Sequence, residues 1–445
     1  MSRWLIRGAS LVDEGRLHEA DLRIVDDRIE RIDPAIPAQP GDTVIEADGL
    51  WLLPGMIDDQ VHFREPGFPD KGDIASESAA AVAGGITSFM DMPNTRPPTL
   101  DGEALEDKCR RAAGRAWGNY GFYHGASNDN LDAIRRIDPH ATPGLKIFMG
   151  ASTGNMLVDD PAVLEAMFRD CPTPVIVHCE DTPTIDALQA DYIRRFGEDV
   201  PPSAHPDIRS RSACFKSSEL AVSLAKRHGT RLHVLHISTA EELALFSPGP
   251  ITQKRITAET CVHFLHFARD DYARLGNLIK CNPAIKDASD RAALIRAVAD
   301  DRIDVIATDH APHTLAEKQQ PYLKAPSGLP LVQHAVVAVL DLVRHGHFTL
   351  TQAVRKLSHA PAQLFDIADR GYTREGYFAD LILVDPNHGF SVNRDDLLYR
   401  CGWSPFEGHH FGTRIVSTWV NGQRVWDGTR LCGEPAGRRL AFNRR

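Results

Sequence analysis

The feature of the sequence that most constrains its fold is a regular alternation of short apolar segments with helix-length segments through the middle of the chain. The helix-length segments include residues 76–85 and 290–301. Eight apolar segments are candidate strands: 56–62, 87–92, 120–125, 145–149, 174–178, 232–237, 256–261 and 305–309. Such alternation is typical of parallel strands joined by helices. Eight units of this kind predict an α/β fold, specifically a TIM-like (β/α)8 barrel.

The two ends of the chain share a different pattern, which predicts a small β module. Segments that alternate apolar and polar residues occur at 4–12, 21–32, 42–53, 377–385 and 414–428. Alternation with a period of two is typical of half-buried strands. Asn421-Gly422 stands between two such runs and favours a tight hairpin turn. We therefore expect residues 1–52 and 366–445 to form one composite β-sandwich module beside a barrel of residues 53–365.

Several candidate strands end in an ionisable or amide side chain, although the strands of a parallel barrel are normally apolar. These residues are His62, Asn94, Lys146, His178, His236 and Asp309. In a barrel of this type the carboxyl ends of the strands lie on one face, where active sites are found. We therefore expect these residues, although far apart in the sequence, to surround one site.

His178, His236 and Asp309 are candidate metal ligands, and each has a simpler structural alternative. A histidine that follows an apolar strand can be a core residue bonded to a backbone carbonyl, and an aspartate can cap a following helix. Together, neutral imidazoles and a carboxylate at strand ends form a ligand set that suits a zinc-like ion in a catalytic site. Asp309 could in addition move a proton.

Lys146 lies inside an apolar segment, where an ammonium group is costly to bury without compensation. Burial lowers the pKa of a lysine and makes its neutral amine available to react. Reaction with carbon dioxide would give a carbamate, an anionic group whose two oxygens can bridge two metal ions. The alternative is a lysine whose ammonium reaches the barrel mouth and forms a salt bridge there.

A second group of polar residues suits substrate binding. Its members are Arg64, Asn94, Asn282 and His313. A guanidinium binds a carboxylate through paired charge-assisted hydrogen bonds, and amide and imidazole groups can add to such a clamp. The group predicts a small anionic substrate that carries amides. Singly, each residue could belong to a turn or to the surface, so the prediction depends on their lying together.

The composition disfavours several other classes of function. The net charge is −10 without a block of basic residues, which argues against a nucleic-acid partner. The eight cysteines are scattered without a C-x-x-C pair, so free thiols in a reducing compartment are expected. Neither a signal peptide nor a run of about 18 apolar residues occurs. We expect a cytoplasmic protein that acts on a small molecule, with no membrane partner, and a homo-oligomer stays open.

Eight short motifs give the sequence a resemblance to a known family. They are HFREPG (62–67), MPNTRPPT (92–99), GLKIF (144–148), VHCE (177–180), LHIST (235–239), NPAIK (282–286), ATDHAPH (307–313) and APSGLP (325–330). In this order and spacing they resemble the amidohydrolase superfamily and, within it, the dihydroorotases. HFREPG with MPNT and TDHAPH are the most specific. The resemblance covers nearly the whole chain, because the split β module is also the family's arrangement.

The resemblance implies a role for each matching residue. One Zn²⁺ would be held by His62, a carbamylated Lys146 and Asp309. A second Zn²⁺ would be held by Lys146, His178 and His236. The substrate would be held by Arg64, Asn94, Asn282 and His313, with backbone contacts from Ser327 and Gly328. Asp309 is the expected catalytic residue, because it would take a proton from the attacking water and deliver it to the leaving nitrogen.

Gln60 departs from the family pattern. The family has H-x-H where this chain has Gln60-Val61-His62, so the first metal site lacks one imidazole and the number of ions, one or two per chain, is open.

The resemblance implies reversible cyclisation of N-carbamoyl-L-aspartate to L-dihydroorotate in pyrimidine (UMP) biosynthesis. Two alternatives stay open: an allantoinase- or hydantoinase-type cyclic amidase, and a catalytically impaired dihydroorotase-like scaffold that binds another pyrimidine enzyme.

Overall fold

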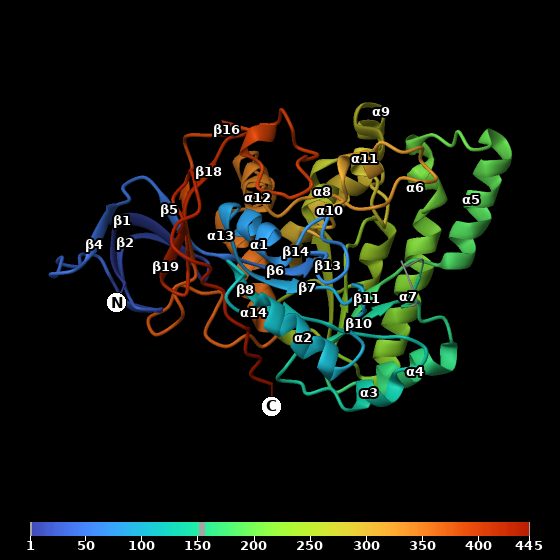
Figure 1. Ribbon diagram of the computed structural model, residues 1–445, viewed down its shortest axis with the longest axis horizontal. Coiled ribbons are helices and arrows are strands. Elements are labelled where there is room, and N and C mark those ends of the chain that lie inside the picture. The colour runs from blue at the N-terminus through green and yellow to red at the C-terminus, as the bar shows by residue number, and fades with distance from the viewer. Residues whose placement is uncertain (1, 151–155, 445) are drawn as a thin grey trace.

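Short parallel strands form a closed barrel in the computed structural model, which describes residues 2–150 and 156–444 (Figure 1). The barrel strands are β6 (Met56–Val61), β7 (Ile86–Asp91), β8 (Asn119–Phe122), β9 (His124–Gly125), β10 (Leu145–Phe148), β11 (Val175–His178), β12 (Leu232–Val234), β13 (Ile256–Cys261) and β14 (Val305–Ala307). Strands β8 and β9 together correspond to the predicted strand 120–125. The barrel closes where Val61 bridges His310. The predicted (β/α)8 barrel is confirmed.

Two of the strands end two or three residues earlier than the sequence predicts. The predicted strands 232–237 and 305–309 stop at Val234 and Ala307. Shortly afterwards His236 and Asp309 have φ angles of 43° and 49°, which lie in the left-handed region. Such a conformation departs from the extended backbone of a strand. Both residues therefore lie on turns that follow the strands, on the face of the barrel where the carboxyl ends meet.

Helices connect the barrel strands and cover the outside of the barrel (Figure 1). They are α1 (Ile74–Ala83), α2 (Gly102–Ala112), α3 (Leu131–Arg135), α4 (Pro161–Asp170), α5 (Thr182–Phe196), α6 (His205–Ile208), α7 (Arg211–His228), α8 (Val262–His266), α9 (Tyr272–Leu275), α10 (Ala288–Ala299), α11 (Leu315–Lys318), α12 (Ala335–Arg344), α13 (Leu350–Val354) and α14 (Ala360–Leu364). The Asp73 carboxylate caps α1 by accepting the N–H of Ser76 at 2.7 Å. The described helices include none that is long and apolar enough to cross a bilayer.

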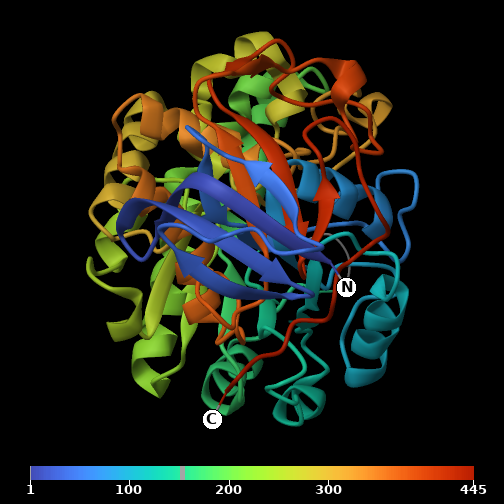
Figure 2. The same cartoon turned by 90° about the vertical axis from the view of Figure 1, so that its left-hand side faces the viewer.

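The two ends of the chain build one eight-stranded sheet, which lies beside the barrel (Figures 1 and 2). Its strands are β1 (Arg3–Asp13), β2 (Arg16–Val25), β3 (Arg28–Asp33), β4 (Thr43–Glu46), β5 (Trp51–Pro54), β15 (Leu381–Asp385), β18 (Arg414–Val420) and β19 (Gln423–Trp426). The order is β19-β18-β15-β5-β1-β2-β3, with β4 beside β1. Antiparallel pairing of β5 with β15 joins the two ends, so the expected pairing of the chain ends is present.

The turn between β18 and β19 is the hairpin predicted from Asn421-Gly422. Both residues have positive φ angles, 49° and 73°, as a two-residue hairpin turn of this type requires. A Cβ atom on Gly422 would lie 1.8 Å from the Asp26 carbonyl oxygen. Only glycine therefore fits at this position, and the turn brings β18 and β19 into register.

Two segments outside the module sheet contact the barrel. Strands β16 (Phe390–Ser391) and β17 (His410–Phe411) flank a loop that lies near α12 (Figure 1). The C-terminal segment runs along β8, where the N–H of Leu440 donates to the Tyr120 carbonyl at 2.9 Å. The domain boundaries given above stay a prediction.

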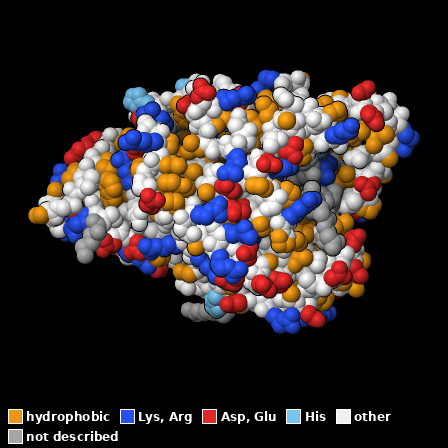
Figure 3. Space-filling view, in the orientation of Figure 1, with side chains coloured by type: hydrophobic (Ala, Val, Ile, Leu, Met, Phe, Trp, Pro, Cys, Tyr) orange, Lys and Arg blue, Asp and Glu red, His pale blue; other side chains and the backbone are white. Residues whose placement is uncertain are grey.

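On the face shown in Figure 3, acidic and basic side chains are interspersed.

Candidate active site

The residues predicted to hold metal follow or end five barrel strands. They are His62 after β6, Lys146 on β10, His178 on β11, His236 after β12 and Asp309 after β14. Four of them are buried, with exposed fractions of 1% for Lys146, 6% for His178, 2% for His236 and 8% for Asp309. The Lys146 ammonium interacts electrostatically with Asp309 and with both buried histidines. The barrel thus brings the five residues to one face.

His62, Gln60 and Asp309 form the first half of the site. His62 Nε2 lies 3.1 Å from Asp309 Oδ1, and His62 Nδ1 lies 2.8 Å from Asn94 Oδ1. The Gln60 side-chain amide donates to the same Asp309 oxygen at 3.0 Å. In this orientation Gln60 presents a hydrogen-bond donor to Asp309, so it supports a predicted ligand instead of replacing the missing imidazole.

His178 and His236 form the second half. Nδ1 of His178 lies 2.9 Å from Nε2 of His236. Burial lowers the pKa of His178, and it lowers the pKa of His236 well below the ordinary value. Both imidazoles are therefore neutral near pH 7, which is the form that binds a metal ion. On its other side His178 Nε2 lies 3.1 Å from a carboxylate oxygen of Glu180.

Lys146 has the environment of a reactive lysine. Burial lowers the pKa of its ammonium group to about 7, and attraction to Asp309 and Glu259 offsets only part of this effect. At neutral pH a large fraction of the side chain is therefore an uncharged amine, which is the form that reacts with carbon dioxide. The ammonium nitrogen lies 4.7 Å from the ring centre of Phe148.

Three predicted site residues share an unusual backbone conformation. Arg64, His236 and Asp309 have φ angles of 69°, 43° and 49°. For residues other than glycine, the left-handed region is sparsely populated and costs about 1–3 kcal/mol in strain. Tertiary contacts must hold these turns, as the hydrogen bonds from His62 and Gln60 to Asp309 do.

Arg64 and His313 lie together beside the first half of the site. Arg64 Nε donates to the Pro312 carbonyl at 2.9 Å, and its Nη2 lies 3.0 Å from His313 Nε2. His313 also contacts the Lys71 ammonium at 3.0 Å and the Ser327 carbonyl at 3.0 Å. Burial lowers the pKa of Arg64 to about 10. In the described residues no carboxylate forms an ion pair with this guanidinium.

Asn282, Ser327 and Gly328 lie in the loops near His313. Within the described part of the chain, the buried Asn282 Oδ1 has no hydrogen-bond partner. The Gly328 N–H donates to the Lys280 carbonyl at 2.9 Å, and its own carbonyl accepts from Lys318 at 2.9 Å. The Ser327 carbonyl accepts from His313. These backbone groups are already engaged, whereas the Asn282 oxygen has no partner among the described residues.

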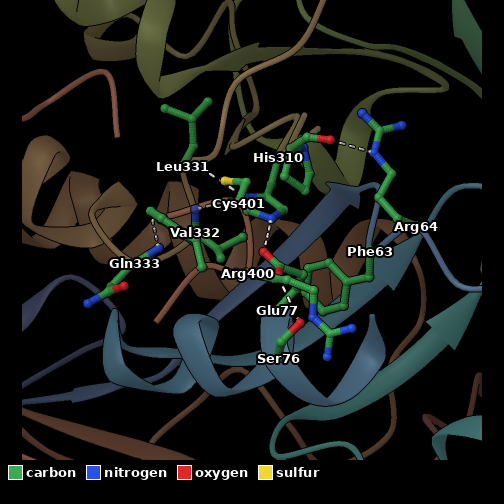
Figure 4. A network of polar contacts seen from close by, with 12 residues as sticks. Phe63, Arg64, Ser76, Glu77, His310, Leu331, Val332, Gln333, Arg400 and Cys401 are labelled. Carbon is green, nitrogen blue, oxygen red and sulfur yellow. Dashed lines mark hydrogen bonds and ion pairs between the residues drawn. The ribbon is translucent and has the colours of Figure 1, made fainter. Parts of the chain in front are cut away.

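Two contacts that support the site have no signal in the sequence. Glu77 on α1 and His310 point toward one another, with 2.9 Å between Oε2 and Nε2 (Figure 4). His310 directly follows Asp309, and its carbonyl accepts the N–H of His62 at 2.7 Å. Trp403, from the loop between β16 and β17, donates to the His313 carbonyl at 2.7 Å. The loop outside the barrel therefore helps to hold the site.

The donor spacings fit a divalent ion. Zinc bonds of roughly 2.0 Å in tetrahedral geometry separate two ligand atoms by about 3.3 Å. The separations of 3.1 Å between His62 and Asp309 and of 2.9 Å between His178 and His236 are close to that value. With neutral imidazoles, a carboxylate and an easily neutralised Lys146, the donor set is one that zinc-like ions prefer.

Comparison with known proteins agrees with this fold. Residues 51–425 match the amidohydrolase family. The dihydroorotase of Halobacterium salinarum is 36% identical over 95% of this chain and 96% of its own length. The allantoinase of Rubrobacter xylanophilus is 32% identical over 98% of this chain and 96% of its own length. The structure of L-hydantoinase from Arthrobacter aurescens is 25% identical, covers 99% of this chain and 100% of its own, and superposes with a TM-score of 0.93. The chain therefore belongs to the amidohydrolase family and is a metal-dependent cyclic amidohydrolase.

Proposed function

We propose that this chain is a dihydroorotase, which interconverts N-carbamoyl-L-aspartate and L-dihydroorotate in pyrimidine biosynthesis. The observation that carries the proposal is the Arg64 guanidinium. Arg64 is half-buried, its side-chain hydrogen bonds within the described residues go to a carbonyl and to a neutral imidazole, and no described carboxylate forms an ion pair with it. A substrate carboxylate would supply the missing partner. L-dihydroorotate carries such a carboxylate beside its ring amide, whereas allantoin carries none.

The metal ligands follow from the two donor pairs. His62 and Asp309 would hold one Zn²⁺, His178 and His236 the other, and a carbamate on Lys146 would bridge them. When bound, such ions lower the pKa of water and polarise a carbonyl group. Gln60 would stabilise Asp309 through its amide hydrogen bond. The more weakly bound ion is expected on the His62 side, where an imidazole ligand is missing.

The remaining residues position the substrate and move its proton. Arg64 and His313 would bind the substrate carboxylate, and Asn94, which contacts His62 at 2.8 Å, would orient the ring between the clamp and Asp309. The Asn282 oxygen would accept from a ring N–H, since it is buried without a partner among the described residues. Asp309 would accept the proton from the attacking water and return it to the leaving nitrogen. Ring closure follows the reverse path.

Allantoinase activity is the second candidate, because the allantoinase relative is nearly as similar as the dihydroorotase relative. A panel of L-dihydroorotate, allantoin and hydantoin, assayed with zinc-reconstituted protein, separates the two. We expect the highest kcat/KM with L-dihydroorotate. A higher value with allantoin would overturn the proposal in favour of the second candidate. Loss of all three activities with retained metal would favour a binding scaffold.

A further inference from the structure

A second group of titratable side chains lies deeper in the barrel than the candidate active site. We call it the inner cluster: Asp59 on β6, His233 on β12 and Glu259 on β13. All three are fully buried, and their ligand atoms lie within 4.8 Å of one another. Strands β6 and β12 are not neighbours in the sheet order, so these side chains meet across the barrel interior. None of them belongs to the predicted metal-ligand set.

The hydrogen bonds of His233 fix which ring nitrogen carries its proton. The Thr257 hydroxyl donates to the Leu232 carbonyl at 3.2 Å, so the same oxygen accepts from His233 Nδ1 at 2.8 Å. The neutral ring then has a bare Nε2. This nitrogen faces Asp59 Oδ2 at 3.2 Å and Glu259 Oε2 at 3.7 Å. Burial opposes protonation of this ring, but hydrogen bonding and attraction to Asp59 and Glu259 outweigh it and raise the pKa of His233 to about 9. The two carboxylates therefore favour a positive charge at this place, which is either a proton on Nε2 or a metal cation between the three groups.

The Glu77–His310 pair shows the opposite arrangement, which needs no ion. His310 Nδ1 accepts the N–H of Leu331 at 2.9 Å, so its proton is on Nε2 and is donated to Glu77. The Ser76 hydroxyl and the Arg400 N–H donate to the other Glu77 oxygen at 2.9 and 3.1 Å (Figure 4). Every oxygen of this buried carboxylate therefore has a donor.

The inner cluster has fewer donors when His233 is neutral, because only Oε1 of Glu259 then accepts a backbone N–H, that of His236 at 3.0 Å. Among the described residues, both carboxylate oxygens of Asp59, Oε2 of Glu259 and Nε2 of His233 have no hydrogen-bond partner. Burying a carboxylate without compensation is costly. A divalent cation would neutralise the two carboxylates and accept the imidazole lone pair. Because both Asp59 oxygens are available, the three side chains could complete a closed coordination shell without water.

We propose that the inner cluster binds a divalent transition-metal ion of the zinc class, separate from the ions of the candidate active site. The distances of 3.2 and 3.7 Å lie on either side of the roughly 3.3 Å that tetrahedral zinc ligands show. A hydrogen bond on the second ring nitrogen, here to Thr257, is typical of metal-binding histidines. The ion joins β6 to β12 and β13 beneath the catalytic face. The inference does not depend on the substrate.

Anomalous diffraction from crystals of the zinc-reconstituted, unmodified chain tests the site directly. An anomalous-difference peak should lie between Asp59, His233 and Glu259 in data collected above the zinc absorption edge. The peak should largely vanish in data collected below the edge. Absence of a peak there overturns the proposal. The positive charge that balances the two carboxylates would then be a proton on His233. A peak there without turnover of L-dihydroorotate would support the inner site and refute the proposed function, so the two can fail separately.

Metal analysis of variants gives a second test. After dialysis against a mild chelator, Asp59→Asn should hold about one zinc fewer per chain than the unmodified protein. Asp304→Asn is the matched control, because it alters a buried carboxylate whose two oxygens accept from Lys254 and from the Ala258 N–H. It should keep the full zinc content. Equal zinc content in Asp59→Asn and the unmodified protein overturns the proposal. If Asp59→Asn does not fold, the diffraction experiment decides.

Discussion

The Gln60 side-chain amide donates to Oδ1 of Asp309 at 3.0 Å, the same oxygen that lies 3.1 Å from His62 Nε2. Gln60 occupies the position at which the family has the first histidine of an H-x-H pair. The chain therefore has a neutral hydrogen-bond donor at this position, and the donor holds the carboxylate of Asp309, a predicted metal ligand. We propose that the exchange lowers metal affinity on one side of the site without abolishing the site.

Gln60→His should raise the metal affinity of the His62 side, because an imidazole is a better ligand than an amide for a borderline-soft ion. After dialysis against a mild chelator, the variant should retain more zinc per chain than the unmodified protein. Gln60→Leu, which can neither donate to Asp309 nor bind metal, should retain less. Equal retention in all three proteins would show that position 60 has no part in metal binding.

Lys146→Ala should lose metal and activity together, because the carbamate would supply an oxygen ligand to each ion. Short carboxylic acids should partly restore both by filling the space with an external anion. Lys356→Ala is a suitable control, since Lys356 is also buried but donates to the Ile303 carbonyl and pairs with Asp301. It should keep its metal. Full metal content in Lys146→Ala would contradict the proposed role.

Arg64→Met should weaken the interaction with a carboxylate-bearing substrate by about 2–5 kcal/mol, as truncation of one partner of a buried charge pair does. The loss should appear in kcat/KM for L-dihydroorotate and should be much smaller for a neutral cyclic amide. Arg110→Met, which removes an exposed arginine on α2, serves as the control. An unchanged kcat/KM for L-dihydroorotate in Arg64→Met would refute the carboxylate clamp.

The barrel was predictable because its signal is local. Each strand shows as a short apolar run, and several of the runs end in a polar residue, so all eight strands and the residues of both donor pairs could be named from the sequence. The early ends of β12 and β14 were not predictable, because the left-handed turns at His236 and Asp309 are held by contacts with other strands.

The supporting contacts were not predictable for a different reason. Glu77 and His310 are 233 positions apart, and nothing in the local sequence of α1 marks Glu77 as the partner of a residue beside Asp309. The inner cluster likewise requires knowledge of which strands face one another across the barrel. Pattern and motif identify the residues that carry chemistry, whereas the packing around them is decided by the closed fold.

Buried histidines should make the metal-free protein less stable in mild acid. Burial lowers the pKa of His334 to about 3 from an ordinary 6.5, so the unfolded chain binds the proton more readily than the folded one. The contribution of neutral His334 to the unfolding free energy is present above pH 6.5. It is lost as the pH falls toward the pKa of His334 in the folded chain. Between pH 7.5 and 5 this one group should cost about 2 kcal/mol of unfolding free energy.

Urea unfolding in the presence of a chelator at both pH values measures this loss of unfolding free energy. His334→Phe should lose less stability over this interval, whereas Leu340→Ala, on the helix α12 that His334 precedes, should lose as much as the unmodified protein. Identical pH dependence in all three would contradict the prediction.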